Sequence, residues 1–211
     1  MSDAPFHLSI DTETLGMREN TVVLSIGVAA FQLVPGAKND YDKIIRDGFH
    51  VKFNVKEQIV NYKRTTDQST IDWWKTQEPA AQKILKPSEE DVDMASGLTM
   101  LNDWIKRSGY RWKDSFVWSR GTYFDFPKLE HMYLQAGVKC GFNTWKIRDT
   151  RTMIDVLTGS ENGQYEPAGG FPRNFLKHDA LHDAAMDAYR MVEIFNLAAG
   201  GEPDDGPPWK E

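Results

Sequence analysis

The first part of the chain carries its apolar residues in the patterns that β-strands use. Residues 6–11 form a short, largely apolar run, and residues 21–33 are rich in β-branched and apolar side chains, as in a mostly buried strand. Residues 48–55 alternate between apolar and polar positions, which is typical of a strand with one buried face. We expect three strands joined by loops, which is an antiparallel start to a sheet.

Helical patterns dominate the remainder and are interrupted by two short strand candidates, residues 115–119 and 144–147. Capping residues, apolar stripes and terminal glycines predict five helices. They cover residues 69–74, 88–105, 125–136 and 149–157, and a last helix that starts at 178 or 179 and runs to about 199. Three strands followed by helices and then by alternating strands and helices indicate an α/β fold with a mixed sheet.

The length and composition fit one folded domain. A chain of 211 residues with 40% hydrophobic residues can bury one substantial core, and it shows no internal repeat or linker. We assign residues 1–199 to a single domain. Residues 200–211 are rich in Pro, Gly and Asp and are expected to form a flexible tail.

Charge and cysteine content limit the function classes. The net charge of -6 argues against a protein that coats nucleic acid by bulk attraction, so any such contact needs a local basic patch or a bound metal. The single cysteine, Cys140, allows no internal disulfide. No apolar run approaches the roughly 18 residues of a membrane span, so we expect no membrane contact and a cytoplasmic location.

The first candidate site is the pair Asp11 and Glu13. Two acids two residues apart on a strand project from the same side of it. Such a pair is costly unless a positive charge neutralises it, and a hard divalent cation with oxygen ligands does this best. The pair therefore predicts a metal site.

Two later segments carry further acids. Asp125 follows a strand candidate and a glycine turn, where an isolated aspartate is most often a helix N-cap. His178 and Asp183 stand five residues apart at the start of the last predicted helix. Taken alone, that segment would be a solvated helix face.

Together the three segments resemble the motifs of the DEDD superfamily of 3′-5′ exonucleases, in its histidine-containing (DEDDh) branch. The first motif, Asp-x-Glu at a strand end, is matched by residues 11–13, and the second, an aromatic residue before Asp, by residues 124–125. The third, His-x-Ala-Leu-x-Asp-Ala, is matched by residues 178–184. The three motifs occur in the family's order.

The chain is also similar to a narrower group, the phage and bacterial exonucleases related to the mycobacterial RNase AS domain. The likeness spans roughly residues 6 to 198, with supporting segments at residues 11–16, 24–27, 71–74 and 148–152. It implies an RNase H-like fold, a mixed five-stranded sheet whose first three strands are antiparallel and which is flanked by helices. That fold agrees with the strand order inferred from the hydrophobic pattern.

The third motif can be placed in two registers, because His182 and Asp187 repeat the spacing of His178 and Asp183. Residues five apart on a helix differ by roughly 140° around its axis, so two helical residues at this spacing do not share a face. The histidine must therefore lie at or before the helix start. His178 meets that condition and fits the family pattern. We expect His182 to be a partly exposed helical residue. Asp187 lies one turn after Asp183 and could help hold it or a basic partner, although a solvated face is favoured.

By resemblance, Asp11, Glu13, Asp125 and Asp183 hold two Mg²⁺ or Mn²⁺ ions about 3.5–4 Å apart, with Asp11 as the bridging ligand. One ion activates a water, the other stabilises the leaving 3′ oxygen, and His178 acts as general base. The catalytic residues are then the four carboxylates and His178.

The resemblance also suggests how the strand end is held. The backbone of Thr12, with Thr14 and Leu15, would pack on the terminal sugar and base, although core packing is an equal alternative for Leu15. Candidates for base stacking, of which Trp118 is expected in the core, are Trp73, Trp74, Trp118, Tyr123 and Phe124. Candidates for phosphate contact, each of which could be an ordinary surface charge, are Arg120, Arg148, Arg151, Arg173 and Lys177.

The predicted function is a two-metal 3′-5′ exonuclease that degrades single-stranded RNA or DNA. No residue in the sequence indicates whether the sugar is ribose or deoxyribose. Three alternatives remain: an RNase H-type endonuclease, a catalytically silent nucleic-acid-binding accessory module, and a Mg²⁺-dependent phosphohydrolase of small nucleotides. Related exonucleases are often dimers, so the resemblance also allows a homodimer.

Overall fold

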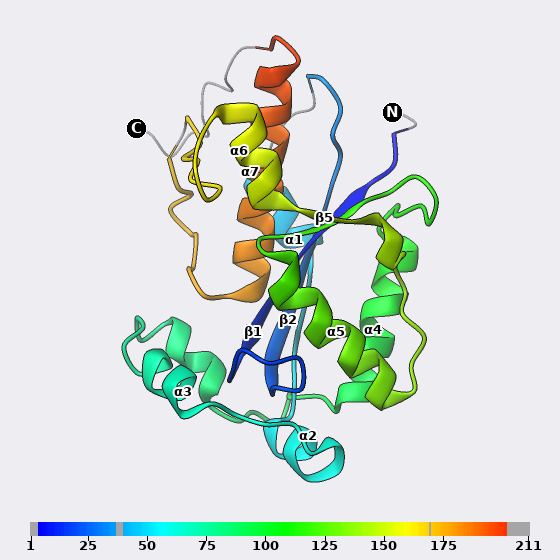
Figure 1. Cartoon of the computed structure of the whole chain (residues 1–211), viewed down its shortest axis with the longest axis vertical. Coiled ribbons are helices and arrows are strands. Elements are labelled where there is room, and N and C mark those ends of the chain that lie inside the picture. Colours follow the sequence, from blue (N-terminus) through cyan, green and yellow to red (C-terminus); the bar gives the residue numbers. More distant parts are fainter. Residues whose placement is uncertain (1–3, 37–39, 169, 202–211) are drawn as a thin grey trace.

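The computed structural model describes residues 4–36, 40–168 and 170–201. Its centre is a single five-stranded sheet with the strand order β3-β2-β1-β4-β5 (Figure 1). The strands are β1 (His7–Thr14), β2 (Val23–Phe31), β3 (Phe49–Lys52), β4 (Val117–Ser119) and β5 (Ile147–Asp149). β1, β2 and β3 pair antiparallel, whereas β4 and β5 run parallel to β1. The predicted mixed RNase H-like sheet is confirmed.

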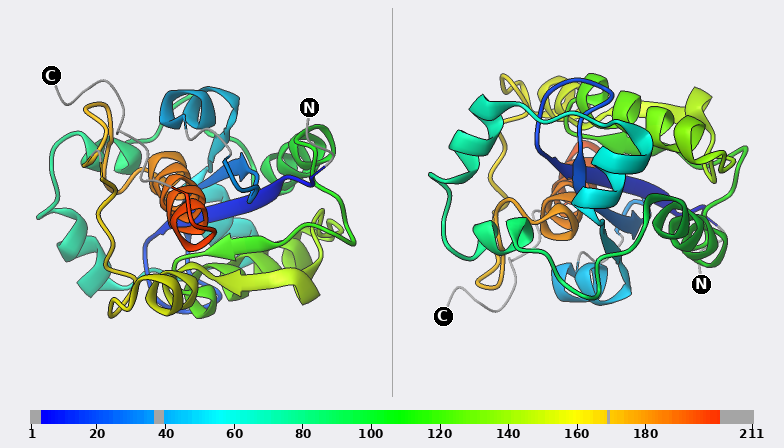
Figure 2. Two further views of the ribbon diagram at one scale, coloured as in Figure 1. Left: turned by 90° about the horizontal axis from the view of Figure 1, so that it is seen from above. Right: turned by 90° about the horizontal axis from the view of Figure 1, so that it is seen from below.

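Helices pack on both faces of this sheet. α7 (Ala180–Ala198) lies against β1 and β2, with α1 (Tyr41–Asp47) and α6 (Thr150–Thr158) beside it, and Figure 2 shows α7 crossing the blue strands. α4 (Met94–Arg107) and α5 (Thr122–Ala136) pack together and contact the sheet. The remaining elements are α2 (Val55–Tyr62), α3 (Gln68–Trp74) and the 3-10 turns η1 (Ala81–Leu85) and η2 (Thr144–Lys146). None of the described helices is long and apolar enough to cross a membrane.

The alternation of side chains along β1 separates two environments. Leu8 and Ile10 are buried in the core that includes residues of α4 and α5. Residues at odd-numbered positions of β1 point to the opposite face, because successive side chains of a strand alternate. Asp11 and Glu13 therefore face α7. The second core, between the sheet and α7, includes the buried Trp118, as expected from the sequence.

The contact between α7 and the sheet depends on Gly27 of β2. A Cβ atom at this position would overlap the backbone of Ala180 and Leu181, so only glycine lets the first turn of α7 come this close. Gly27 pairs with Asp11 across the β1–β2 ladder. The same close approach therefore brings the start of α7 over the acidic end of β1.

Two helices near the start of the chain were not predicted. The region between the second and third strands contains α1, so the expectation of strands joined only by loops was wrong there. Residues 53–55 do not continue the third strand, since β3 ends at Lys52 and α2 begins at Val55. The overlooked signal is Asn54, whose side chain accepts a hydrogen bond from the Glu57 N–H at 3.0 Å and so caps a helix.

Other boundaries differ for similar local reasons. α4 begins at Met94 rather than at residue 88, because Asp93 is the capping residue and accepts from the Ser96 N–H at 2.9 Å. Residues 144–146 form η2, so the fifth strand starts at Ile147. The boundaries of α3, α6 and α7 agree with the prediction within one or two residues. Most of the tail predicted at 200–211 lies outside the described residues.

The overlap at Gly27 leads to a prediction. The Gly27→Ala variant should be destabilised by about 1–3 kcal/mol, the usual range for overpacking, because the added methyl meets backbone atoms that cannot rotate away. For a chain of this length, that corresponds to a melting temperature lower by roughly 3–10 °C, measured by circular dichroism. In Gly137→Ala the added methyl meets nothing within 4 Å, but the left-handed backbone at this glycine (φ of 65°) disfavours a side chain, so this comparison variant measures a backbone cost of about 1–2 kcal/mol without any overlap. An unchanged melting temperature for Gly27→Ala would contradict the close approach.

Candidate active site

One cavity gathers the residues of the three sequence motifs. It has a volume of about 1070 Å³ and lies where the C-terminal part of β1 meets the N-terminal ends of α5 and α7. The five predicted catalytic residues all line it: Asp11, Glu13, Asp125, His178 and Asp183. Segments more than 100 residues apart in the sequence thus contribute to one site.

Asp125 is held against β1 by Thr12. The Thr12 N–H and hydroxyl both donate to Oδ1 of Asp125, at 3.1 and 2.7 Å. Asp125 does not cap its helix, as it would if it were only a capping residue, because α5 begins at Thr122 after Gly121. Instead, Asp125 lies buried in the first turn of α5, where its carboxylate is near enough to Asp11 to raise the pKa of that residue.

His178 lies just before the last helix, as the spacing argument requires. α7 begins at Ala180 with Asp179 as its capping residue. The backbone of His178 is left-handed, with φ of 62°, and its N–H donates to Oδ2 of Asp183 at 2.8 Å. A left-handed conformation is uncommon for a residue other than glycine, and functional sites often contain such residues.

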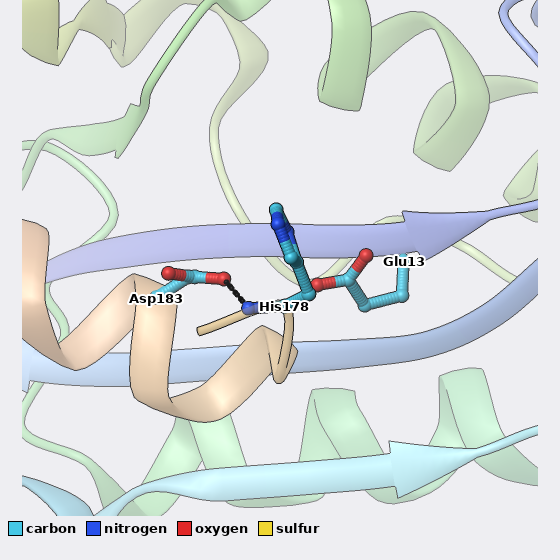
Figure 3. A group of neighbouring side chains, drawn as sticks. All are labelled: Glu13, His178 and Asp183. Atoms are coloured by element: carbon cyan, nitrogen blue, oxygen red, sulfur yellow. Dashed lines mark hydrogen bonds between the residues drawn. The ribbon is translucent and has the colours of Figure 1, made fainter. Parts of the chain in front are cut away.

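Figure 3 shows His178 between Glu13 of β1 and Asp183 of α7. One potential ligand atom from each of these three side chains lies within 4.8 Å of the others, so the group could hold a metal ion. The geometry brings together residues from opposite ends of the chain.

Two tryptophans of α3 hold His178 from the other side. The Trp73 and Trp74 rings meet the imidazole edge-on, with centroid distances of 4.9 and 6.2 Å. Trp74 is fully buried, and its Nε1 donates to the Thr14 carbonyl at 2.9 Å. The end of β1 and the position of His178 are therefore fixed through the same helix.

His182 has a different environment. Its Nδ1 lies 2.8 Å from the hydroxyl of the buried Tyr41, and its ring packs against Phe175. It is helical and partly exposed, as expected. The structure therefore brings His178, and not His182, to the acidic residues.

The electrostatics of the site favour a cation. Burial, and then repulsion from neighbouring acids, raises the pKa values of Asp11 and Glu13 well above their usual range. Burial also raises the pKa of Asp125 to about 6 and that of Asp183 to about 7. Four ionised carboxylates at this distance repel one another. Divalent cations that prefer oxygen ligands would relieve the repulsion, so the group is suited to binding them. Burial lowers the pKa of His178, which favours the neutral imidazole.

Asp187 is a further functional candidate, for which the sequence analysis favoured the wrong one of two alternatives. It does not lie on a solvated helix face; it is buried and forms ion pairs with the basic partners Arg120 and Arg190, each at 3.0 Å. The two arginines also bond the carbonyls of Gly163 and Tyr165, at 3.1 Å each. Asp187 therefore links α7 to the long loop beside the cavity. Its position one helical turn after Asp183 was the available signal.

The predicted substrate contacts separate into two groups. Thr12, Thr14 and Phe124 line the cavity, whereas Leu15 is buried in a separate small core with Trp74. Arg148 is exposed on β5 and is not among the cavity-lining residues. The N–H of Thr12 is already engaged by Asp125.

Phe124 is held by a buried lysine. The ammonium of Lys128 lies 3.2 Å from the centroid of the Phe124 ring and donates to the carbonyls of Phe124 and Met17, at 2.8 and 3.1 Å. Burial lowers the pKa of Lys128 to about 8. Lys128 thus joins the loop after β1 to the start of α5, the two segments that border the cavity on this side.

Comparison with solved structures finds the same fold in two other proteins. Over 90% of its length the chain resembles cell-death related nuclease 4 (CRN-4), with a TM-score of 0.56 and 15% identity, and it spans 64% of that chain. It also resembles the nuclease domain of 3'hExo, a DEDDh family member solved with bound rAMP, with a TM-score of 0.58, 14% identity and 96% of each chain covered. At these identities the likeness establishes the shared fold.

Sequence comparison gives the family. Residues 6–195 match the 3'-5' exoribonuclease Rv2179c-like domain. The chain is 34% identical to an exodeoxyribonuclease of Enterobacteria phage T4, over 98% of its own length and 95% of the relative. The chain therefore belongs to the Rv2179c-like 3′-5′ exoribonuclease domain family, and it is a 3′-5′ exonuclease.

Proposed function

We propose that this exonuclease hydrolyses single-stranded RNA or DNA from the 3′ end with two Mg²⁺ or Mn²⁺ ions. The observation that carries the proposal is the convergence of four carboxylates and His178 on one cavity. The family description names an exoribonuclease, and the phage relative is named an exodeoxyribonuclease. Both polymers are therefore candidate substrates, and the 2′-OH is the group that would distinguish them.

The donor set fits divalent cations. Asp11, Glu13, Asp125 and Asp183 would hold the ions, since hard cations prefer carboxylate oxygens and these groups resist ionising side by side. When bound, such ions supply an activated water and stabilise the charge that develops on the leaving 3′ oxygen. The carboxylates come from β1, α5 and α7, so these three elements together would hold the ions.

His178 would take the proton of the attacking water as general base. Its neutral form is favoured by burial, and a neutral imidazole nitrogen can accept a proton. The hydrogen bond from its backbone to Asp183 and the edge-on contact with Trp73 limit how the ring can turn. These contacts therefore hold the base beside the metal-ligating carboxylates.

The cavity would hold the terminal nucleotide between β1 and α5. Thr14 and Phe124 are the lining residues that we assign to the sugar and base, with the Phe124 ring positioned by Lys128. Leu15 lies in the core, so it would not contact the nucleotide and would instead support the loop after β1 by packing. The homodimer and the cytoplasmic location stay predictions.

The substrate class can be tested with matched RNA and DNA oligonucleotides labelled at the 5′ end. A 3′-5′ exonuclease should shorten the label-bearing strand one nucleotide at a time in Mg²⁺ and leave a circular single strand intact. Cleavage of the circle would indicate an RNase H-type endonuclease. Turnover of mononucleotide substrates alone would indicate a small-nucleotide phosphohydrolase.

The role of His178 leads to a second prediction. His178→Ala should lower kcat by about 10²–10⁴-fold, the usual contribution of a general base, while metal binding measured by calorimetry changes little. His182→Ala is the matched control from the alternative register, and its turnover should stay within a few-fold of wild type because His182 faces Tyr41. Near-normal turnover of His178→Ala would exclude this mechanism.

The raised pKa values lead to a third prediction. A carboxyl group whose pKa is raised by folding stabilises the protein below its unfolded pKa, near 4, and this stabilisation is lost as pH rises through the folded pKa. For Asp183 the folded value is about 7, so the ionised group destabilises the metal-free protein at pH 8. Asp183→Asn in EDTA should therefore melt roughly 3–8 °C above wild type at pH 8, because it removes a charge that is disfavoured by burial and by repulsion from Asp187, and a gain of about 1–3 kcal/mol shifts the melting temperature by that amount.

The advantage of Asp183→Asn should shrink towards pH 5, where the wild-type carboxyl is protonated. Added Mg²⁺ should raise the melting temperature of wild type more at pH 8 than at pH 5, and should raise that of the variant less. Differential scanning fluorimetry at the two pH values measures all four states. A variant that melts below wild type at pH 8 in EDTA would contradict the repulsion.

A further inference from the structure

Two tryptophans away from the cavity are strongly exposed. Trp145 of η2 is 90% exposed and Trp112 is 49% exposed, whereas Trp74 and Trp118 are buried. The two exposed residues belong to adjacent segments, because Asn143 donates to the Trp112 carbonyl at 3.1 Å and accepts from the Trp145 N–H at 3.1 Å. Large exposed aromatic side chains that lie close together commonly mark a binding surface.

Positive charge accompanies these tryptophans. Residues 111–114 and 144–148 contain four basic residues and one acid, although the chain as a whole carries a net charge of -6. Lys146 and Arg148 both lie over the Phe116 ring, at 5.3 and 4.6 Å from its centroid. Aromatic and cationic side chains are thus combined on two neighbouring segments, which Asn143 joins. We call this the β5-edge surface and define it by Trp112, Lys113, Trp145, Lys146 and Arg148.

The β5-edge surface is connected to the active site by an edge strand of the sheet. β5 is the last strand in the sheet order and runs from η2 towards α6, as can be followed in Figure 1. At its far end Asp149 accepts from the N–H groups of Gly121 and Thr122 at the start of α5. Arg151 and the 75% exposed Tyr123 then line the cavity. At about 3.3 Å per extended residue, the surface extends from roughly 10 Å from the rim at Arg148 to roughly 20 Å at Trp145.

We propose that the β5-edge surface binds the single-stranded nucleic acid several nucleotides upstream of the 3′ end held in the active site. This inference rests on the proposed function. A protein that binds a single strand without reading its sequence combines cations for the phosphates with aromatic rings on which bases stack. Trp145 and Trp112 supply the rings, and Lys113, Lys146 and Arg148 supply the cations. Arg148, predicted to contact phosphate, would do so here and not in the cavity.

The charge also selects the occupant. A second copy of this chain would bring another net charge of -6, and an apolar protein partner would have to desolvate three cations. A polyanion with stacking bases is complementary to both components of the surface. The occupant would be the substrate strand itself, so the surface should affect long substrates and not short ones.

The test uses Trp145→Ala and the double variant Lys146→Gln with Arg148→Gln. With a 30-nucleotide single strand, each should raise KM about tenfold and leave kcat unchanged. With a dinucleotide, which is too short to reach the surface, kcat/KM should equal that of wild type. In an Asp183→Asn background, fluorescence anisotropy should show weaker binding of the long strand. The double variant should lower the salt slope of log Kd by about 1.4, or 0.7 per lost phosphate contact.

The matched control is Lys43→Gln with Arg46→Gln. It removes the same charge from α1, the helix that precedes the opposite edge strand β3, and it should leave both substrates unaffected. If the control raised KM for the long strand as much as the β5-edge variants, the effect would come from net charge alone, and the proposal would be overturned. Unchanged KM for the long strand would also overturn it, as would a change in oligomeric mass on Trp145→Ala. If wild type degrades neither substrate, the proposed function itself fails.

Discussion

The active site depends on the contact between the first turn of α7 and β2 at Gly27. The backbone of Ala180 lies where any larger residue at Gly27 would place its Cβ atom. Because Gly27 pairs with Asp11, this contact sets the distance between the acids of β1 and the start of α7. His178 and Asp183 belong to that start, so the position of the proposed base follows from a backbone contact in which neither side chain takes part.

The same contact confines negative charge. Burial and mutual repulsion oppose the ionisation of Asp11, Glu13 and Asp183. If α7 were free to move, Asp183 would move away from the two acids of β1. The sheet and the packed face of α7 prevent that movement. The acids therefore stay close together, and a bound cation would relieve their mutual repulsion. Thr12 of β1 donates two hydrogen bonds to Asp125, which completes the set from a separate helix, α5. Rigid apolar packing thus supports a site that is unfavourable without its ions.

Sequence patterns failed where a local capping signal competed with an apolar pattern. Val55 continues the alternation of the third strand, yet Asn54 caps a helix that begins at this residue, and the capping geometry prevails. Asp187 shows a second kind of failure. An acid on a helix has no partner visible in the sequence, so its burial between Arg120 and Arg190 appears only when the loop and the preceding strand are folded beside α7.

The sequence by itself determined the α/β class, the mixed sheet and the motif residues, because strand alternation, helix periodicity and motif spacing are local properties of the chain. It also favoured His178 over His182, since helix geometry forbids the second register. Only the tertiary structure decided that Leu15 is a core residue and that Arg148 lies outside the cavity. The physical reason is that burial, and the distance between charges, depend on which segments pack together, and residues far apart in the chain carry no local signal of that packing.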